Sequence, residues 1–132
     1  MTGVRGLDHI NLRAPADVIE QTRQFYIDVI GLREGPRPTF RFGSHGYWLY
    51  AGDTALLHLS IGPQAPPTTE RPNGYFSHYA LACSDLEGAR ARLEAAGVRY
   101  NIDVIDERNQ VQIFAIDPAG IVVELDFRLD EQ

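Results

Sequence analysis

The chain contains two copies of one structural pattern, and this internal repeat constrains the fold more than any other feature of the sequence. Residues 7–12 (LDHINL) resemble residues 76–81 (FSHYAL), and residues 56–59 (LLHL) resemble residues 122–125 (VVEL). Each copy has one ligand-type side chain in its early segment and one in its late segment. The repeat therefore predicts two modules of the same architecture.

The polar residues of the repeat interrupt apolar strands at matching positions: His9, His58, His78 and Glu124. A polar side chain buried without a partner costs free energy, so residues at these positions in apolar strands are poorly explained as ordinary surface residues. One divalent cation bound between the two halves would account for all of them. Imidazole and carboxylate ligands suit zinc, nickel, iron, manganese or cobalt, with site geometry choosing among these metals.

Length, charge and residue usage exclude several classes of protein. A chain of 132 residues fits one compact domain, residues 1–132. Its net charge of −6 argues against a nucleic-acid partner. Each of the 12 basic residues is arginine, which excludes Schiff-base lysine chemistry and a P-loop. Cys83 is the single cysteine, and no signal peptide or membrane-length apolar run is present, so we expect a cytoplasmic protein without a membrane partner.

The first module is predicted over residues 4–62. A strand over 4–12 places Leu7, His9 and Asn11 on one face. An apolar stripe at helical spacing then runs from Pro15 to a stop at Gly31. Strands are expected at 33–42, 46–51 and 54–61, with a hairpin turn at residues 52–53.

The second module is predicted over residues 75–128, after a proline-rich linker at 62–74. A strand over 75–83 precedes a capping-box spacing at 84–87, which opens a helix that ends at Gly97. Strands follow at 98–105, 110–116 and 121–127, with a type I turn at 117–120. The fold class is therefore α+β, with two strand-helix-three-strand (βαβββ) modules that form mixed sheets.

Side-chain alternation decides where the candidate ligands point. In strands 54–61 and 121–127 the aliphatic residues flank His58 and Glu124, so the aliphatic face packs on the helices and the ligand face lines a cavity. If the two sheets curl toward each other, within one chain or across a dimer, the ligands meet on the cavity floor.

Several motifs resemble the vicinal oxygen chelate superfamily, which contains glyoxalase I, fosfomycin-resistance enzymes, extradiol dioxygenases and metal-free bleomycin-binding proteins. They are the Leu-Asp-His-Ile strand at 7–10, the helix end FYIDVIGL at 25–32 and the ending DPAGIVVEL at 117–125. The resemblance spans nearly the whole chain. It implies a glyoxalase-like fold and a ligand set at His9, His58, His78 and Glu124. In glyoxalase I the position of His58 usually carries a carboxylate or an amide.

The resemblance also implies a small-molecule substrate and a homodimer with shared sites. Arg13 resembles an arginine that glyoxalase I uses on the glutathione carboxylate, although a solvent-facing ion pair would also explain it. Asn11 lies on the same face as Arg13. Phe42 and Trp48 belong to a set of alternating aromatic residues that either wall the substrate pocket or pack in the core.

The number of ligands bears on the reaction. Four protein ligands leave an octahedral ion two positions, which is enough for a substrate that chelates through adjacent oxygens. The favoured reaction is then a glyoxalase-I-like isomerisation or lyase reaction, with Glu124 as a ligand that also moves a proton. If His58 is a base instead of a ligand, the remaining three ligands suit iron and an extradiol dioxygenase. A metal-free protein that binds a drug or metabolite is the alternative outside the enzymes.

Overall fold

The structure is a computed structural model that describes residue 3 and residues 6–40, 44–62 and 78–131, without the side chains of residues 107 and 131. Its first module consists of β1 (Ile10–Ala14), α1 (Ala16–Phe25), the π-helical turn η1 (Tyr26–Ile30), β2 (Arg33–Gly35), β3 (Gly46–Ala51) and β4 (Thr54–Ile61). The second consists of β5 (His78–Cys83), α2 (Leu86–Ala95), β6 (Tyr100–Ile105), the 3₁₀ turn η2 (Asp106–Arg108), β7 (Gln110–Ile116), β8 (Val122–Arg128) and the 3₁₀ turn η3 (Leu129–Glu131).

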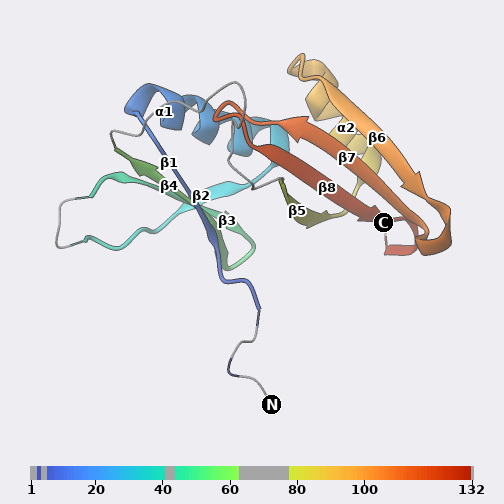
Figure 1. Ribbon diagram of the computed structural model, residues 1–132, viewed down its shortest axis with the longest axis horizontal. Coiled ribbons are helices and arrows are strands. Elements are labelled where there is room, and N and C mark those ends of the chain that lie inside the picture. Colours follow the sequence, from blue (N-terminus) through green and yellow to red (C-terminus); the bar gives the residue numbers. More distant parts are fainter. Residues whose placement is uncertain (1–2, 4–5, 41–43, 63–77, 132) are drawn as a thin grey trace.

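Each module forms a four-stranded mixed sheet, and the two sheets have the same topology. The strand orders are β1-β4-β3-β2 and β5-β8-β7-β6. In each sheet the first strand pairs in parallel with the last, and the other pairs are antiparallel. The modules lie side by side, with η1 packed against α2 where they meet (Figure 1). The α+β class and the repeated βαβββ architecture are confirmed.

The strands alternate as the sequence predicts. In β4, Leu57 and Leu59 are buried in the core, whereas His58 and Ser60 are only partly covered. In β8, Val123, Leu125 and Phe127 are buried among the same core residues. The aliphatic faces of both sheets therefore pack beneath the helices, and the candidate ligands lie on the opposite faces.

Three expected elements are corrected by the structure. The strand expected over 4–12 begins at Ile10 and ends at Ala14, because β4 pairs with it only along Leu57–Ile61, and His9 therefore lies just before the strand. The strand expected over 33–42 ends at Gly35, because Pro36 and Pro38 have no N–H to donate to a strand partner. The N-cap of α2 is Asp85 rather than Ser84, since the Asp85 side chain accepts a hydrogen bond from the Gly88 N–H at 3.1 Å. The capping box predicted at 84–87 is therefore one residue out of register.

The first helix also ends differently from a regular α-helix. It continues as the π-helical turn η1, in which Gly31 and Leu32 both donate their N–H to the carbonyl oxygen of Tyr26. Gly31 has a φ of +99°, in the left-handed region that favours glycine, so the predicted stop is confirmed. The widened turn places Tyr26 at the boundary with the second module.

A buried hydrogen-bond chain joins the modules at this point. The Tyr79 hydroxyl donates to the Tyr26 hydroxyl at 2.5 Å, and Tyr26 donates to Asp117 Oδ2 at 2.7 Å. Asp117 Oδ1 accepts from the N–H groups of Ala119 and Ile121 at 2.9 Å, which fixes the turn before β8. Burial raises the pKa of Asp117, against the effect of these donors. The chain thereby ties η1 to β5 and to the β7–β8 turn.

Two further expectations concern the linker and the membrane. The linker predicted at 62–74 lies outside the described residues except for Gly62. Among the helices that the structure describes, none has the length and apolar character needed to cross a membrane.

Candidate functional site

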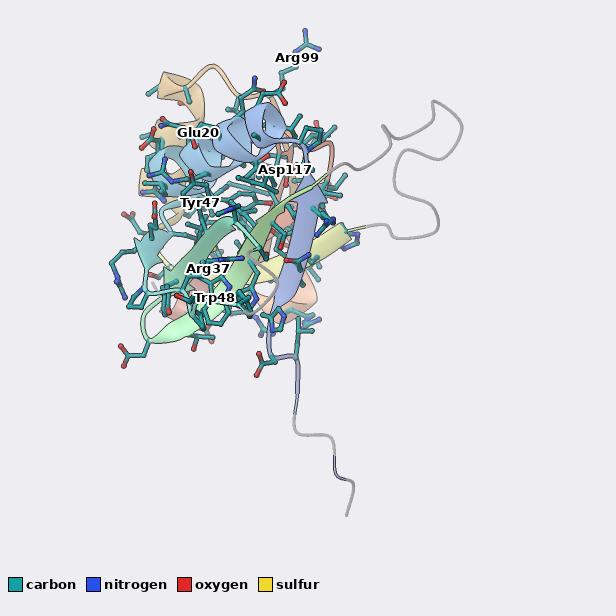
Figure 2. The ribbon with its side chains drawn as sticks, turned by 90° about the vertical axis from the view of Figure 1, so that its left-hand side faces the viewer. Glu20, Arg37, Tyr47, Trp48, Arg99 and Asp117 are labelled. Atoms are coloured by element: carbon teal, nitrogen blue, oxygen red, sulfur yellow. The ribbon has the colours of Figure 1, made fainter. Side chains whose placement is uncertain are left out.

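The first cluster of candidate site residues lies on the exposed face of the first sheet. The rings of His9 and His58 stack with centroids 3.8 Å apart and planes 16° apart, and Trp48 stacks on the other side of His58 at 4.0 Å and 7°. Trp48 and His58 are directly opposed in the β3–β4 register, which explains their contact. Figure 2 shows Trp48 close to Arg37 at one end of this sheet, whereas Arg99 projects from the other end of the molecule.

One ring nitrogen of each histidine in this cluster is engaged in a hydrogen bond. His9 Nδ1 lies 2.8 Å from Asp8 Oδ1, and His58 Nε2 lies 3.1 Å from the carbonyl oxygen of Ala55. The carboxylate of Asp8 orients His9 so that Nε2 carries the lone pair available to an ion, as a carboxylate does behind many metal-binding histidines. Burial, and then the neighbouring His9, lower the pKa of His58.

The stacked arrangement limits what His9 and His58 can bind together. An imidazole binds a metal through a lone pair in the plane of its ring. Rings stacked 3.8 Å apart, with planes only 16° from parallel, confine their lone pairs to two nearly parallel planes rather than directing them to one point. In this arrangement His9 and His58 do not converge on a single ion, and His58 presents its ring face to Trp48.

The second cluster lies on the face of the second sheet opposite its aliphatic core face. His78 Nε2 is 3.0 Å from Glu124 Oε1. Bonds of about 2.1 Å that meet at a right angle at one ion place their donor atoms about 3.0 Å apart. The nitrogen and oxygen donors of His78 and Glu124 therefore fit adjacent positions around a divalent cation. Phe114 lies edge-on to His78, with ring centroids 6.0 Å apart.

Glu124 is the most constrained member of this cluster. It is only 6% exposed, and its Oε2 accepts a hydrogen bond from Gln112 Nε2 at 3.0 Å. Burial, followed by the neighbouring Asp126 carboxyl, raises the pKa of Glu124, whereas His78 and Gln112 act in the opposite direction. Both oxygens of Glu124 therefore have a polar partner, His78 for Oε1 and Gln112 for Oε2.

The two clusters are separate within one chain. Within residues 6–40, 44–62 and 78–131, no three histidine, cysteine, aspartate or glutamate side chains lie close enough together to hold a metal ion. His9 and His58 pair on the first sheet, and His78 and Glu124 pair on the second. The sequence leaves open whether the four candidate ligands meet within one chain or across a dimer. In the structure, the described residues of a single chain do not bring the four ligands together.

The other predicted site residues lie around the first cluster. Asn11 Oδ1 accepts a hydrogen bond from the Ser60 hydroxyl at 2.8 Å, and Arg13 is exposed two residues further along β1. A hollow of about 550 Å³ lies over Trp48 and the histidines. Its lining is formed by Asp8, His9, Phe40, Trp48, Asp53, Thr54, Ala55 and His58. Phe42 lies outside the described residues, so its predicted role in substrate binding has no structural description.

Sequence reasoning missed two residues that contact the candidate ligands. Asp8 bonds His9, and Gln112 bonds Glu124. The signal for Gln112 was present, because Gln110, Gln112 and Phe114 alternate on the face of β7 that neighbours Glu124. The signal for Asp8 was its position next to His9.

A model of the Glyoxalase/Bleomycin resistance protein/Dioxygenase superfamily matches residues 6–125. The chain belongs to this superfamily. Its match includes all the candidate ligands, from His9 to Glu124.

Solved structures of the superfamily share the fold. A glyoxalase family protein from Bacillus anthracis is 22% identical with a TM-score of 0.77, and the match covers 97% of this chain and 98% of that one. Lactoylglutathione lyase from Agrobacterium tumefaciens is 18% identical with a TM-score of 0.65, covering 96% of both chains. The fosfomycin resistance protein FosX from Listeria monocytogenes, in complex with Mn(II) and sulfate, is 17% identical with a TM-score of 0.63, covering 94% of this chain and 93% of that one. Curated protein sequences gave no match.

Proposed function

We propose that this superfamily member is a metal-dependent lyase or isomerase of the glyoxalase I type, acting on a small substrate with adjacent oxygen atoms. The observation that carries the proposal is the His78–Glu124 pair, whose donor atoms are 3.0 Å apart and suit neighbouring positions on one ion. A divalent ion, nickel, zinc, cobalt or manganese, would stabilise negative charge on the substrate oxygens when bound. His9 supplies a further donor from the first module.

The proposed site is shared between two chains of a homodimer. The candidate ligands of one chain form two separated pairs, on the faces of its two sheets. A two-fold arrangement that sets the first sheet of one chain against the second sheet of its partner brings one pair of each kind together, twice per dimer. His9 of one chain then meets His78 and Glu124 of the other.

The side chains around the proposed site have separate tasks. Glu124 would take a proton from one substrate carbon and return it to the adjacent carbon. Arg13 and Asn11 bind anionic and polar parts of the substrate. Trp48 forms the wall beside His58, in the hollow of about 550 Å³.

An extradiol-type dioxygenase is the second candidate, and the setting of His58 favours it. His58 stacks on Trp48 and bonds the Ala55 carbonyl, which leaves His9, His78 and Glu124 as a set of two histidines and one carboxylate. Such a set suits Fe(II) and leaves positions for a catecholate and dioxygen. His58, with its lowered pKa, is then available as a base that is neutral near pH 7.

Metal analysis and substrate assays together test the proposal. Protein purified without oxygen is expected to hold about one nickel, zinc, cobalt or manganese ion per chain and to convert methylglyoxal with glutathione. The His58→Ala variant separates a ligand from a wall residue, because only loss of a ligand lowers metal content. Iron in both proteins with activity on catechols would replace the isomerase with the dioxygenase. A protein that binds no added metal would refute both and favour a binding protein.

A further inference from the structure

The two carboxylate oxygens of Glu124 have different partners, and this asymmetry has a cause in the neighbouring strand. Oε1 faces His78 Nε2 at 3.0 Å, whereas Oε2 accepts the Gln112 amide N–H at 3.0 Å. Gln112 lies on β7 opposite Asp126 of β8, one diagonal step from Glu124. Its side chain reaches Glu124 across the ladder, along the face that carries the candidate ligands.

The bond belongs to a short ladder of amide and carboxylate pairs. Two residues before Gln112, Gln110 donates its Nε2 to Asp126 Oδ1 at 2.9 Å. Gln110 is 4% exposed and Glu124 is 6% exposed. Neighbouring carboxylates in a poorly solvated position repel each other, and each amide N–H stabilises the carboxylate that it contacts. The Glu124 and Asp126 side chains interact with each other, and each accepts an amide N–H from β7.

We propose that Gln112 is a positioning residue that makes Glu124 a one-oxygen ligand. An N–H group on Oε2 holds that oxygen away from an ion bound beside His78, so that Oε1 alone is presented. A carboxylate that binds through both oxygens would occupy one more position on the ion. Gln112 thus preserves a position for the second oxygen of a chelating substrate. This inference rests on the proposed metal site.

The test compares Gln112→Met with Gln110→Met in the full-length protein, using Co(II) as the probe. Methionine has a similar length to glutamine and no N–H, so each variant removes one amide donor from the same strand face. Gln110 contacts Asp126, which neighbours Glu124 but is not a proposed ligand, so Gln110→Met is the control for loss of an amide donor that does not bond Glu124 itself. Gln112→Leu is a second variant, and circular dichroism checks that each protein is folded.

Two readouts, neither of which is activity, are expected to change in the Gln112 variants. Their affinity for Co(II), measured by competition with a chelator, falls about 10- to 100-fold, the usual effect of losing a group that orients a ligand. Their visible Co(II) absorption also weakens, because Co(II) absorbs less intensely as its coordination number rises. The Gln110→Met variant keeps the wild-type affinity and spectrum.

The outcomes separate this inference from the proposed function. Wild-type affinity and spectrum in folded Gln112 variants would overturn the role of Gln112 and leave the metal site standing. Equal changes in the Gln110 and Gln112 variants would also overturn it, because the effect would then belong to the sheet rather than to the bond with Glu124. If the wild-type protein bound no Co(II), the proposed function would fail and the inference with it.

Discussion

Replacing Tyr26 with phenylalanine removes one hydroxyl group from the contact between the two modules. Tyr26 is 0% exposed, so water does not replace the lost group without structural rearrangement. The hydroxyl donates to Asp117 at 2.7 Å and accepts from Tyr79 at 2.5 Å. The substitution therefore leaves one buried acceptor and one buried donor without their partners, while the ring that packs in the core is retained.

The magnitude follows from these two bonds. A hydrogen bond to a charged group contributes about 1.5–3 kcal/mol, and one between neutral groups contributes about 1 kcal/mol. The free energy of unfolding should fall by roughly 2–4 kcal/mol. For a chain of this length the corresponding decrease in Tm is roughly 7–14 °C. Tyr79→Phe, which removes only the outer bond, should lower the free energy of unfolding by about 1 kcal/mol.

Urea denaturation with a chelator present removes the contribution of bound metal, and one fixed protein concentration keeps the mass-action effect of dimerisation the same for every variant. Tyr47→Phe is the matched control, because its hydroxyl contacts Glu20 at 3.3 Å on the exposed surface. The control should change the free energy of unfolding by no more than about 0.5 kcal/mol. If Tyr26→Phe were as mild as Tyr47→Phe, the hydrogen-bond chain would not hold the modules together.

Further predictions concern pH, packing and metal. Burial raises the folded-state pKa of Asp117 above the ordinary value of 3.8. As the pH rises, the unfolded chain therefore loses this proton before the folded chain does. The free energy of unfolding of the wild type should then fall relative to that of Asp117→Asn between pH 3.8 and the raised pKa. Denaturation between about pH 4 and pH 7 tests this, and a constant difference would contradict it. Gly46→Ala should lower the free energy of unfolding, measured in urea, by about 3 kcal/mol or more, because the added Cβ would lie 1.9 Å from the Leu59 carbonyl oxygen. Gly3→Ala is the control, since a Cβ at Gly3 meets no atom within 4 Å and should leave the stability unchanged. Co(II) at about 100 times its Kd should raise the free energy of unfolding by about 2.7 kcal/mol per site in the wild type and much less in His78→Ala; equal increases would argue against His78 as a ligand.

The sequence predicts the regular strands well because their alternation and their turns agree. β3, β4 and β7 have the predicted bounds, and Gly31 and Gly97 end their helices with positive φ. The predictions are wrong where local chemistry competes with the pattern. Pro36 ends β2 early, and Asp85 takes the cap position expected for Ser84. In each case a neighbouring residue changes which backbone groups can bond.

The candidate site likewise has features that the sequence predicts and contacts that it does not predict. A polar residue within an apolar strand marks His58 and Glu124 without knowledge of their neighbours, because alternation alone sets the face. The stacking of His58 on Trp48 and the bond from Gln112 to Glu124 depend on strand register between β3 and β4 and between β7 and β8. Register is a property of paired strands, so these contacts could be found only after the strands were placed together.

In the proposed homodimer, one metal site takes His9 from one chain and Glu124 from its partner. The direct test mixes two variants, His9→Ala and Glu124→Ala, after each has been shown to bind little metal alone. In the shared arrangement each mixed dimer has one site with both residues intact, and random mixing makes half of the dimers mixed. Bound metal should then rise to about a quarter of the wild-type amount. If subunit exchange is verified and metal binding stays at the level of the separate variants, the shared-site account is contradicted.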